Sequence, residues 1–425
     1  ACLAALPAAC SKPSTAPTET PADSPAKPAG EKPRDPAPPA PPVPIKPANP
    51  AEAEIAPKVT AARAILDPWH QTDPVPGKRV LRLVLWTPRD REPAPQYRER
   101  LSLIMRDIQK FYASEMERLG FGPRTIQLEE ATDGMLDIHL VKGEKDYSAY
   151  NGDSGHAIRK ECLPVLKAAG IDADNETIVI FCNMSNWDAG KRVISQNSPY
   201  YAGGNHAKGT AWQVDSAIRN LASLADKANN VKDGQYGNIS LGKYNSIFIG
   251  GIAHELGHAL GLPHNCQRAD EQAAFGTALM GSGNRTYGEQ LRGESKGSFL
   301  TLAHGLRLAS HPMFSGSIKQ IEASNKAAIN DIKLARKDKG FTLSGKVTSP
   351  IPVYAVLGYM DPAGGGDYDA TTTTAIPDAE GNFTLDCQAL KAGKSGELRV
   401  VPLQANGAVA GWLGDSPIKF SYQVS

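Results

Sequence analysis

Two histidines four residues apart could hold one metal ion. His254 and His258 lie in the run Gly-Ile-Ala-His-Glu-Leu-Gly-His-Ala-Leu-Gly-Leu-Pro-His-Asn, at positions 251–265. On a helix of 3.6 residues per turn, positions four apart share a face, so both imidazoles can reach one point. Glu255 is offset by one residue, which sets its carboxylate beside the metal and within reach of a bound water. The spacing predicts metal-assisted hydrolysis.

A glycine and a proline can bring a third histidine to the same point. Gly261 can take a left-handed conformation, which would end the helix and turn the chain back. Pro263 stiffens the return, so His264 approaches from another direction. Three neutral imidazoles leave a fourth position for water, as in a catalytic zinc site. Two alternatives are a core helix with incidental histidines and a metal site that does not turn over, and the presence of Glu255 disfavours the second.

The motif H-E-x-x-H-x-x-G-x-x-H resembles that of the metzincin zinc metallopeptidases. The positions that carry the resemblance are His254, Glu255, His258, Gly261 and His264. The resemblance implies a Zn²⁺ cofactor held by the three histidines, Glu255 as general base, and a protein or peptide substrate. It also implies an α+β catalytic domain, with a mixed sheet and an active-site helix.

The resemblance further implies a methionine-containing turn beneath the zinc. Met280, within residues 278–284, is the candidate, as a packed floor under the imidazoles and not a ligand. Some metzincins carry a tyrosine two residues after this methionine, where this chain has Ser282. Tyr287 lies further along and is a candidate contact to the transition state.

A substrate-facing edge strand is also expected from the resemblance, near residues 205–214, where substrate backbone would add to the sheet. His206 lies where this strand is expected and is a candidate substrate contact, with an ordinary structural role as the alternative. The remaining histidines lack ligand spacing and are expected to be structural or exposed: His70, His139, His156, His304 and His311.

The sequence before the motif alternates between strand-like and helix-like segments. Apolar runs predict strands at residues 78–86, 125–129, 136–141 and 177–182. Apolar residues at helical spacing predict helices at residues 97–119 and 155–169. This alternation indicates a mixed sheet covered by helices, in a catalytic domain over residues 61–315.

Beyond a linker at residues 316–328, short β-rich runs are separated by turn clusters. This pattern predicts a small all-β immunoglobulin-like sandwich over residues 329–425, without a catalytic constellation. The turn containing Asp361, Asp367 and Asp369 matches no regular calcium motif, so it is read as an acidic turn, with a calcium loop as the alternative.

The N-terminal 60 residues are expected to be a signal remnant followed by a disordered tether. Fourteen of the 33 prolines fall between Pro13 and Pro50, in a stretch too polar to build a core. Ala8 and Ala9 directly before Cys10 resemble a bacterial lipoprotein processing site, which implies a lipid on Cys10 and membrane attachment. Simple signal cleavage with secretion is the alternative. Either way, an exported protein of the cell envelope or the extracellular space is expected.

The amino-acid composition excludes some classes of protein function. With Lys+Arg 46 against Asp+Glu 45, the formal net charge is +1, which argues against a nucleic-acid binder. No C-x-x-C pair occurs, and disulfide pairing is left open among the cysteines that follow Cys10: Cys162, Cys182, Cys266 and Cys387. The sequence thus favours a secreted or surface-anchored zinc-dependent endopeptidase. One alternative is a surface-displayed glycan- or protein-binding protein with a non-catalytic zinc site, which Glu255 disfavours. A second alternative keeps hydrolysis but changes the substrate, for example to peptidoglycan cross-links or glycoproteins, and the sequence does not separate it.

Overall fold

The computed structural model describes residues 49–323, 326–364, 366–410 and 418–424, all within one compact unit. Cys10 and most of the proline-rich stretch lie outside these residues, so the predicted lipid site has no structural counterpart here. Within the described ranges, no helix has the length and apolar character needed to cross a membrane. The four cysteines after Cys10 are free thiols.

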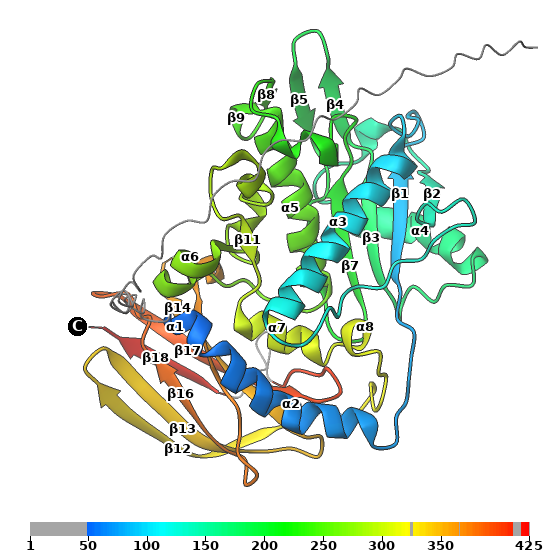
Figure 1. The fold of residues 1–425 in the computed structure, drawn as a ribbon. Coiled ribbons are helices and arrows are strands. Elements are labelled where there is room, and N and C mark those ends of the chain that lie inside the picture. The colour runs from blue at the N-terminus through cyan, green and yellow to red at the C-terminus, as the bar shows by residue number, and fades with distance from the viewer. Residues whose placement is uncertain (1–48, 324–325, 365, 411–417, 425) are drawn as a thin grey trace, which may run out of the picture. The chain divides into compact units, whose positions relative to one another are not determined.

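The largest sheet has five strands, in the order β2-β1-β3-β7-β6, and lies on the right in Figure 1. The first four of these strands run parallel: β2 (Ile138–Lys142), β1 (Leu81–Thr87), β3 (Thr177–Cys182) and β7 (Gly209–Val214). Strand β6 (Tyr201–Gly204) pairs antiparallel with β7 and forms one edge. Because both faces are covered, β3 and β7 are buried at every position, as central parallel strands usually are.

Helices cover both faces of this sheet. Leu83 and Leu85 of β1 belong to the core shared with α3 (Tyr97–Arg118) and α5 (Leu241–Ala259). Successive strand residues point to opposite faces, so Val84 and Trp86 lie in the other core, against α4 (Gly155–Ala168). The predicted mixed sheet covered by helices is therefore confirmed.

Two predictions about strands were wrong. Residues 125–129 contribute only a single bridge, between Leu128 and Leu81. The segment 205–214 does not supply the edge, because β7 is paired on both sides and β6 lies outside it. A small sheet in the order β4-β5-β8-β9 was not predicted, since its strands are short and mostly polar: β4 (Ser185–Asp188), β5 (Val193–Gln196), β8 (Asn230–Asp233) and β9 (Gly237–Ser240).

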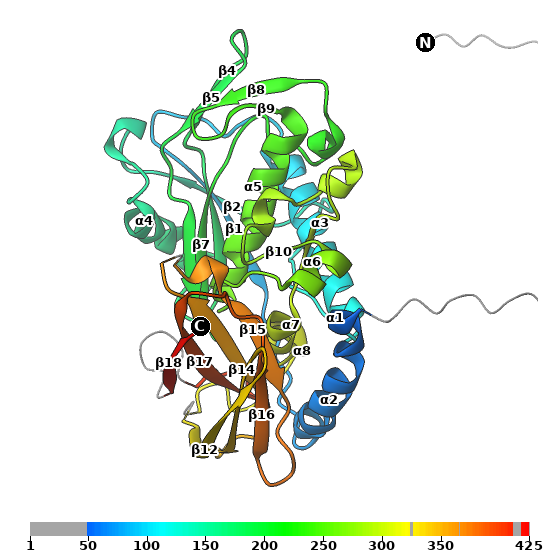
Figure 2. The same ribbon diagram turned by 90° about the vertical axis from the view of Figure 1, so that its left-hand side faces the viewer.

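The C-terminal part consists of two antiparallel sheets, as the short β-rich runs predicted. One has the order β12 (Ala328–Lys337), β13 (Gly340–Thr348), β16 (Asn382–Cys387). The other has the order β15 (Thr371–Ala375), β14 (Val353–Pro362), β17 (Ser395–Gln404), β18 (Lys419–Gln423). Figure 2 shows these strands below α5 and beside α7 (Leu302–Ala309). We call this region the two-sheet part.

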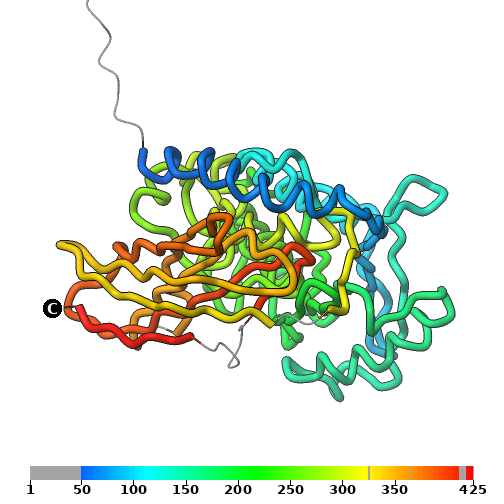
Figure 3. The backbone as a smooth tube through the Cα atoms, turned by 90° about the horizontal axis from the view of Figure 1, so that it is seen from below, coloured from blue at the N-terminus to red at the C-terminus, as the bar shows by residue number. Residues whose placement is uncertain are grey.

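One continuous apolar core joins the two-sheet part to the helices. Tyr354 and Leu357 of β14 belong to the same buried cluster as Leu306 of α7 and Leu66 of α2 (Ile55–Gln71). The Tyr354 hydroxyl also donates to the Ser310 hydroxyl oxygen, 2.9 Å away. Helix α2 runs alongside both regions (Figure 3). The two-sheet part also has a second buried cluster of its own, which includes Leu343, Val356 and Leu398, and the domain boundaries drawn from sequence stay a prediction.

Helical structure begins earlier than the predicted end of the tether at residue 60. Helix α1 spans Pro50–Ala53, with Asn49 as its cap, and α2 follows at once. Val59, Ala62 and Leu66 are buried, which anchors α2 to the core. The remaining short α-helices and strands are α6 (Ala269–Phe275), β10 (Thr277–Ala278), β11 (Ser298–Phe299) and α8 (Pro312–Ser315), and short 3-10 helices include η1 (Tyr147–Ala149), η2 (Leu221–Ala225) and η4 (Glu289–Arg292).

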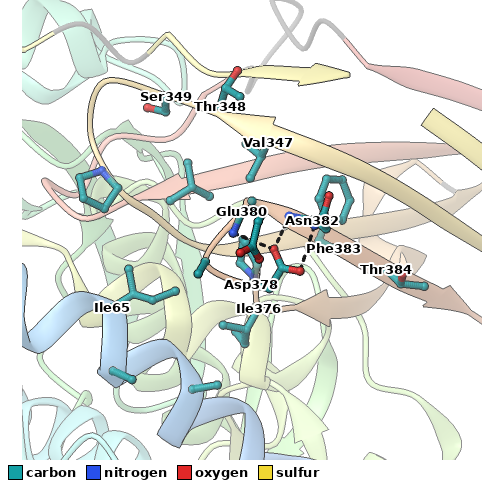
Figure 4. A pocket seen from close by; sticks show the side chains of 17 residues that line it. Ile65, Val347, Thr348, Ser349, Ile376, Asp378, Glu380, Asn382, Phe383 and Thr384 are labelled. Carbon is teal, nitrogen blue, oxygen red and sulfur yellow. Dashed lines mark hydrogen bonds between the residues drawn. The ribbon is translucent and has the colours of Figure 1, made fainter. Parts of the chain in front are cut away.

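A hollow of about 950 Å³ lies between α2 and the turn that joins β15 to β16 (Figure 4). Its acidic residue Asp378 is engaged in that turn, where the carboxylate accepts from the Asn382 backbone N–H at 2.7 Å and side-chain amide at 3.0 Å. These bonds lower the pKa of Asp378. The carboxylate therefore serves the turn, and the hollow has no residue in common with the histidine motif.

Candidate metal centre

Helix α5 carries the first two histidines and the glutamate. Its N-terminus is capped by Ser240, whose hydroxyl accepts from the Lys243 backbone N–H at 3.0 Å. Ile249, Ile252 and Leu256 are buried in the main core, which fixes the rotation of the helix. The helix is nearly all buried because it lies between the sheet and the loops after it. His254 and Glu255 are consequently held on a rigid element.

Gly261 ends the helix as predicted. Its φ of +82° lies in the left-handed region, which glycine adopts without strain. The Leu262 N–H then donates to the Gly257 carbonyl at 2.9 Å, which closes the C-terminal turn. The chain reverses and returns His264 towards α5.

The structure brings the three histidines together. One ring nitrogen from each of His254, His258 and His264 lies within 4.8 Å of the others. The Nε2 atoms of His258 and His264 are 3.0 Å apart. Two Zn–N bonds of about 2.0–2.1 Å at a tetrahedral angle would set such nitrogens about 3.3 Å apart. The observed spacing is close to that of a metal centre.

Each of these imidazoles is held through its other ring nitrogen. The Nδ1 of His254 is 2.7 Å from the Leu279 carbonyl oxygen, and that of His258 is 2.8 Å from the Leu262 carbonyl oxygen. A carbonyl oxygen only accepts, so both Nδ1 atoms carry the proton and both Nε2 atoms present a lone pair. Lone pairs that converge without a proton between them fit a cation, and the site therefore fits a bound metal ion.

Burial keeps these imidazoles neutral. Loss of hydration, with a smaller contribution from the neighbouring imidazoles, lowers the pKa of His254 to about 3 and that of His258 to about 4. Neutral imidazole is the form that binds a metal. The pair is thus ready to bind metal at neutral pH.

Glu255 lies in a cleft beside the triad. The cleft has a volume of about 320 Å³, and it is also lined by His258, His264, Tyr200 and the edge strand β6. Only 8% of Glu255 is exposed. Burial raises the pKa of its carboxyl to about 7. A carboxyl group in this position can exchange a proton with a water or substrate in the cleft.

Met280 lies directly beneath α5. It is fully buried, and a Cβ placed on Gly257 would lie 2.4 Å from its Sδ atom. The preceding residue supplies the carbonyl that holds His254. The Asn265 N–H donates to the Met280 carbonyl at 3.2 Å, which links this turn to the segment after the third histidine. Met280 is therefore packed against α5 at Gly257, next to the residue that holds His254, and its role as a floor under the imidazoles stays a prediction.

Two other candidates from the sequence do not reach the cleft. Tyr287 is 5% exposed, packs against Gly250, and donates from its hydroxyl to Asp107 Oδ2 at 2.7 Å. It lies elsewhere along α5 because the short helix η3 (Gly283–Arg285) leads the chain away from the metal centre. The Nε2 of His206 is 3.0 Å from the Ile321 carbonyl oxygen, and its ring does not line the cleft. Neither side chain is positioned for the predicted contact.

The sequence missed two residues of the two-sheet part. Asp367 and Tyr368, in the short helix η5 (Asp367–Asp369) between β14 and β15, both line the cleft. Asp367 Oδ1 is 2.9 Å from His264 Nδ1, and the Tyr368 ring stacks on the same imidazole. The prediction that this part contains no catalytic constellation did not anticipate that two of its residues line the cleft. No local pattern marks the pair, since 103 residues separate Asp367 from His264.

The acidic turn around Asp367 does not gather its carboxylates. Asp361 pairs with Arg399 at 2.7 Å and Asp369 with Lys391 at 2.6 Å, while Asp367 faces His264. Among the described residues, the three histidines are the only cluster arranged to hold a metal ion. The reading as an ordinary acidic turn fits this arrangement better than a calcium loop.

The fold and the site together define a mixed α/β protein with a three-histidine metal centre. No family model and no curated protein matches the chain. Solved structures do match it: wild-type OgpA from Akkermansia muciniphila is 26% identical, with a TM-score of 0.66 over 82% of this chain and 95% of that one. Catalytically inactive OgpA in complex with an O-glycopeptide substrate is 25% identical, with a TM-score of 0.66 over 82% of this chain and 94% of that one. The chain thus resembles an enzyme over nearly that enzyme's whole length.

Proposed function

We propose that the chain is a zinc-dependent endopeptidase of the metzincin type, in which Glu255 is the general base. The observation that carries this proposal is the convergence of three Nε2 lone pairs beside the buried Glu255 carboxyl. Zinc is the metal that three neutral imidazoles with an open fourth position best suit. The likeness to OgpA, whose inactive form was captured with a substrate, supports an enzyme.

In the proposed reaction, the protein orients the reactants and moves one proton. Bound zinc would supply a water of lowered pKa and polarise the scissile carbonyl. Glu255 takes the proton from this water as its oxygen attacks the carbonyl carbon, and later gives it to the leaving amine as the C–N bond breaks. The carbonyl partners of His254 and His258 hold both rings in the binding tautomer throughout.

We propose that the substrate is a glycosylated peptide that adds along β6. OgpA provides the precedent, through its complex with an O-glycopeptide. Strand β6 is one of the two edge strands of the sheet among the described residues, and it lines the cleft of the metal centre. The same strand lines a second hollow of about 570 Å³ on the α4 side, together with polar and aromatic residues such as Arg159, Lys208 and Trp212. Because side chains alternate along a strand, a peptide paired with β6 would present successive groups to both hollows.

We propose that the protein is exported and attached to a membrane through a lipid on Cys10. The support is the sequence around that cysteine and the proline-rich spacer after it. The natural protein and the Cys10→Ala variant would be expressed with a complete export signal and separated into membrane and soluble fractions. We expect the variant in the soluble fraction and the natural protein in the membrane fraction. The same distribution for both proteins would contradict lipid attachment at Cys10.

The peptidase proposal is tested with Glu255→Gln, which keeps the size of the side chain and removes the base. Zinc content and cleavage would be measured for both proteins, on an O-glycosylated peptide and on the same peptide without its glycan. The variant is expected to keep its zinc and to cleave about 10² to 10⁴ times more slowly, because general-base catalysis contributes that much. If the natural protein holds zinc yet cleaves neither peptide nor a broad peptide library, a binding protein with a non-catalytic zinc site replaces the proposal.

A further inference from the structure

The third histidine is held differently from the first two. His254 and His258 donate to backbone carbonyls, whereas His264 faces a carboxylate, Asp367 Oδ1, at 2.9 Å. We infer that Asp367 is a positioning residue for His264, so that the two-sheet part completes the metal centre. The inference rests on metal binding by the three histidines and does not depend on peptide cleavage.

The geometry separates positioning from ligation. Asp367 contacts Nδ1, while Nε2 of the same ring faces His258 at 3.0 Å. The carboxylate therefore lies on the side of the imidazole opposite the metal-binding nitrogen. It fixes the proton on Nδ1, leaves the lone pair on Nε2, and makes the ring a stronger donor to a cation. A charged acceptor does this more strongly than the carbonyls that hold the other two rings.

The approach of Asp367 is imposed by the backbone around it. The segment that follows His264 bonds to the segment that follows Asp367: the Cys266 N–H donates to the Ala370 carbonyl at 2.7 Å. Two residues further, Arg268 Nη1 donates to the Thr372 carbonyl at 3.2 Å. The Cys266 thiol donates to the Asp369 carbonyl at 3.2 Å. These three contacts fix the alignment of the segment after His264 with the segment after Asp367. His264 and Asp367 lie at the end of this pairing.

Tyr368 covers the contact on one side. Its ring lies over the His264 imidazole, which leaves only 16% of the His264 side chain exposed. Shielding from water strengthens a charge-assisted hydrogen bond. The Asp367 side chain itself is 38% exposed, so the shielding that distinguishes this pair from an ion pair in open solvent lies on its histidine side.

The test compares Asp367→Ala and Asp367→Asn with Asp369→Asn. The control removes a carboxylate of the same turn that pairs with Lys391 and does not face a histidine. Zinc affinity would be measured by competition with a chromophoric chelator, and the cobalt-substituted proteins by visible absorption. Asp367→Ala is expected to bind zinc about 10- to 100-fold more weakly, as for other partners of metal-bound histidines. Asp367→Asn is expected to lose less, because its amide oxygen still accepts a hydrogen bond from Nδ1.

The melting temperature of each metal-free protein shows whether a variant has lost fold stability, and so distinguishes that effect from a loss of His264 positioning. It is expected to change little for either Asp367 variant, and Asp369→Asn is expected to bind zinc as the natural protein does. Zinc affinity within about threefold of the natural value in Asp367→Ala would overturn the inference, as would an equal loss in Asp369→Asn. If Asp367→Ala fails to fold, Asp367→Ser, whose side chain is too short to reach Nδ1, decides by the same criteria. These measurements need no substrate, so a failed peptidase proposal would leave their outcome intact.

Discussion

The ring of Tyr368 stacks on the imidazole of His264, with centroids 3.6 Å apart and an angle of 27° between the planes. Tyr368 comes from the two-sheet part, and 54% of it remains exposed at the cleft. An exposed aromatic ring beside a metal centre offers a surface to a substrate group, whether a peptide side chain or a sugar ring. Burial and the nearby Glu255 carboxylate raise the pKa of the Tyr368 hydroxyl, so the side chain stays neutral.

Replacing Tyr368 with Ala should therefore weaken substrate binding more than it slows the chemical step. An aromatic contact contributes about 0.5–1.5 kcal/mol, so KM should rise about 2- to 12-fold while kcat changes less. Tyr368→Phe keeps the ring and should behave as the natural protein does. Steady-state kinetics on a cleaved glycopeptide measure both constants. A fall in kcat with unchanged KM would instead assign the ring to the metal centre alone.

Gly257 and Met280 are coupled by their close approach. A Cβ on residue 257 would lie 2.4 Å from the Met280 Sδ atom, whereas alanine is otherwise favoured over glycine in a helix by about 1 kcal/mol. Met280→Ala alone should cost about 2–5 kcal/mol, because it opens a cavity under α5. In that background the space for a Cβ exists, so Gly257→Ala should be more favourable than in the natural protein by at least about 1 kcal/mol. Denaturant unfolding of all four proteins gives this coupling energy, and additive effects would show that Met280 moves aside freely.

Removal of the metal should lower thermal stability, since the folded chain gathers three imidazoles that the unfolded chain leaves apart. A ligand present at 1,000 times its Kd stabilises the folded state by about 4 kcal/mol. A strong chelator should therefore lower the melting temperature by several degrees, and added zinc should restore it. His258→Ala is the control, because its melting temperature should no longer respond to the chelator. An equal shift in both proteins would point to a metal bound elsewhere.

Local patterns in the sequence predict the helices and strands that hold the site, because the formation of these elements depends on residues that are close in the chain. The apolar run of β3 and the periodicity of α3 are read correctly, and the histidine spacing predicts the triad. Pairing between distant segments is not encoded locally. Strand β7 is therefore read as an edge, although β6 pairs outside it. The contact between Asp367 and His264 is missed for the same reason.

Composition misplaces the start of the ordered chain. Helix α2 contains Pro57 and Pro68, and it follows a stretch rich in proline and alanine. Pro57 lies in the first turn of α2, where the missing backbone donor costs nothing, so the helix tolerates it. What stabilises α2 is the burial of Val59 and Leu66 against distant segments. The proline- and alanine-rich sequence therefore gave no signal for α2, which is stabilised by tertiary packing.

His311 should make the protein sensitive to acid. It is 4% exposed and caps α8, where its Nδ1 accepts from the Met313 N–H at 3.2 Å. Burial, with a smaller contribution from the nearby His206, lowers its pKa from 6.5 to about 3. Between these values the unfolded chain binds a proton that the folded chain does not. Stability is therefore present above pH 6.5 and is lost as the pH falls, by about 2 kcal/mol at pH 5 from this residue alone.

The variant His311→Asn isolates this contribution, because asparagine also caps helices and does not titrate. Unfolding free energies of the metal-free proteins would be measured in denaturant at pH 7.5, 6.0 and 5.0, so that loss of zinc from the triad does not contribute. The natural protein should lose stability more steeply than the variant below pH 6.5, by up to about 1.4 kcal/mol per pH unit. Parallel curves would mean that His311 is charged in the folded state, and that its ring finds a second acceptor when it binds the proton.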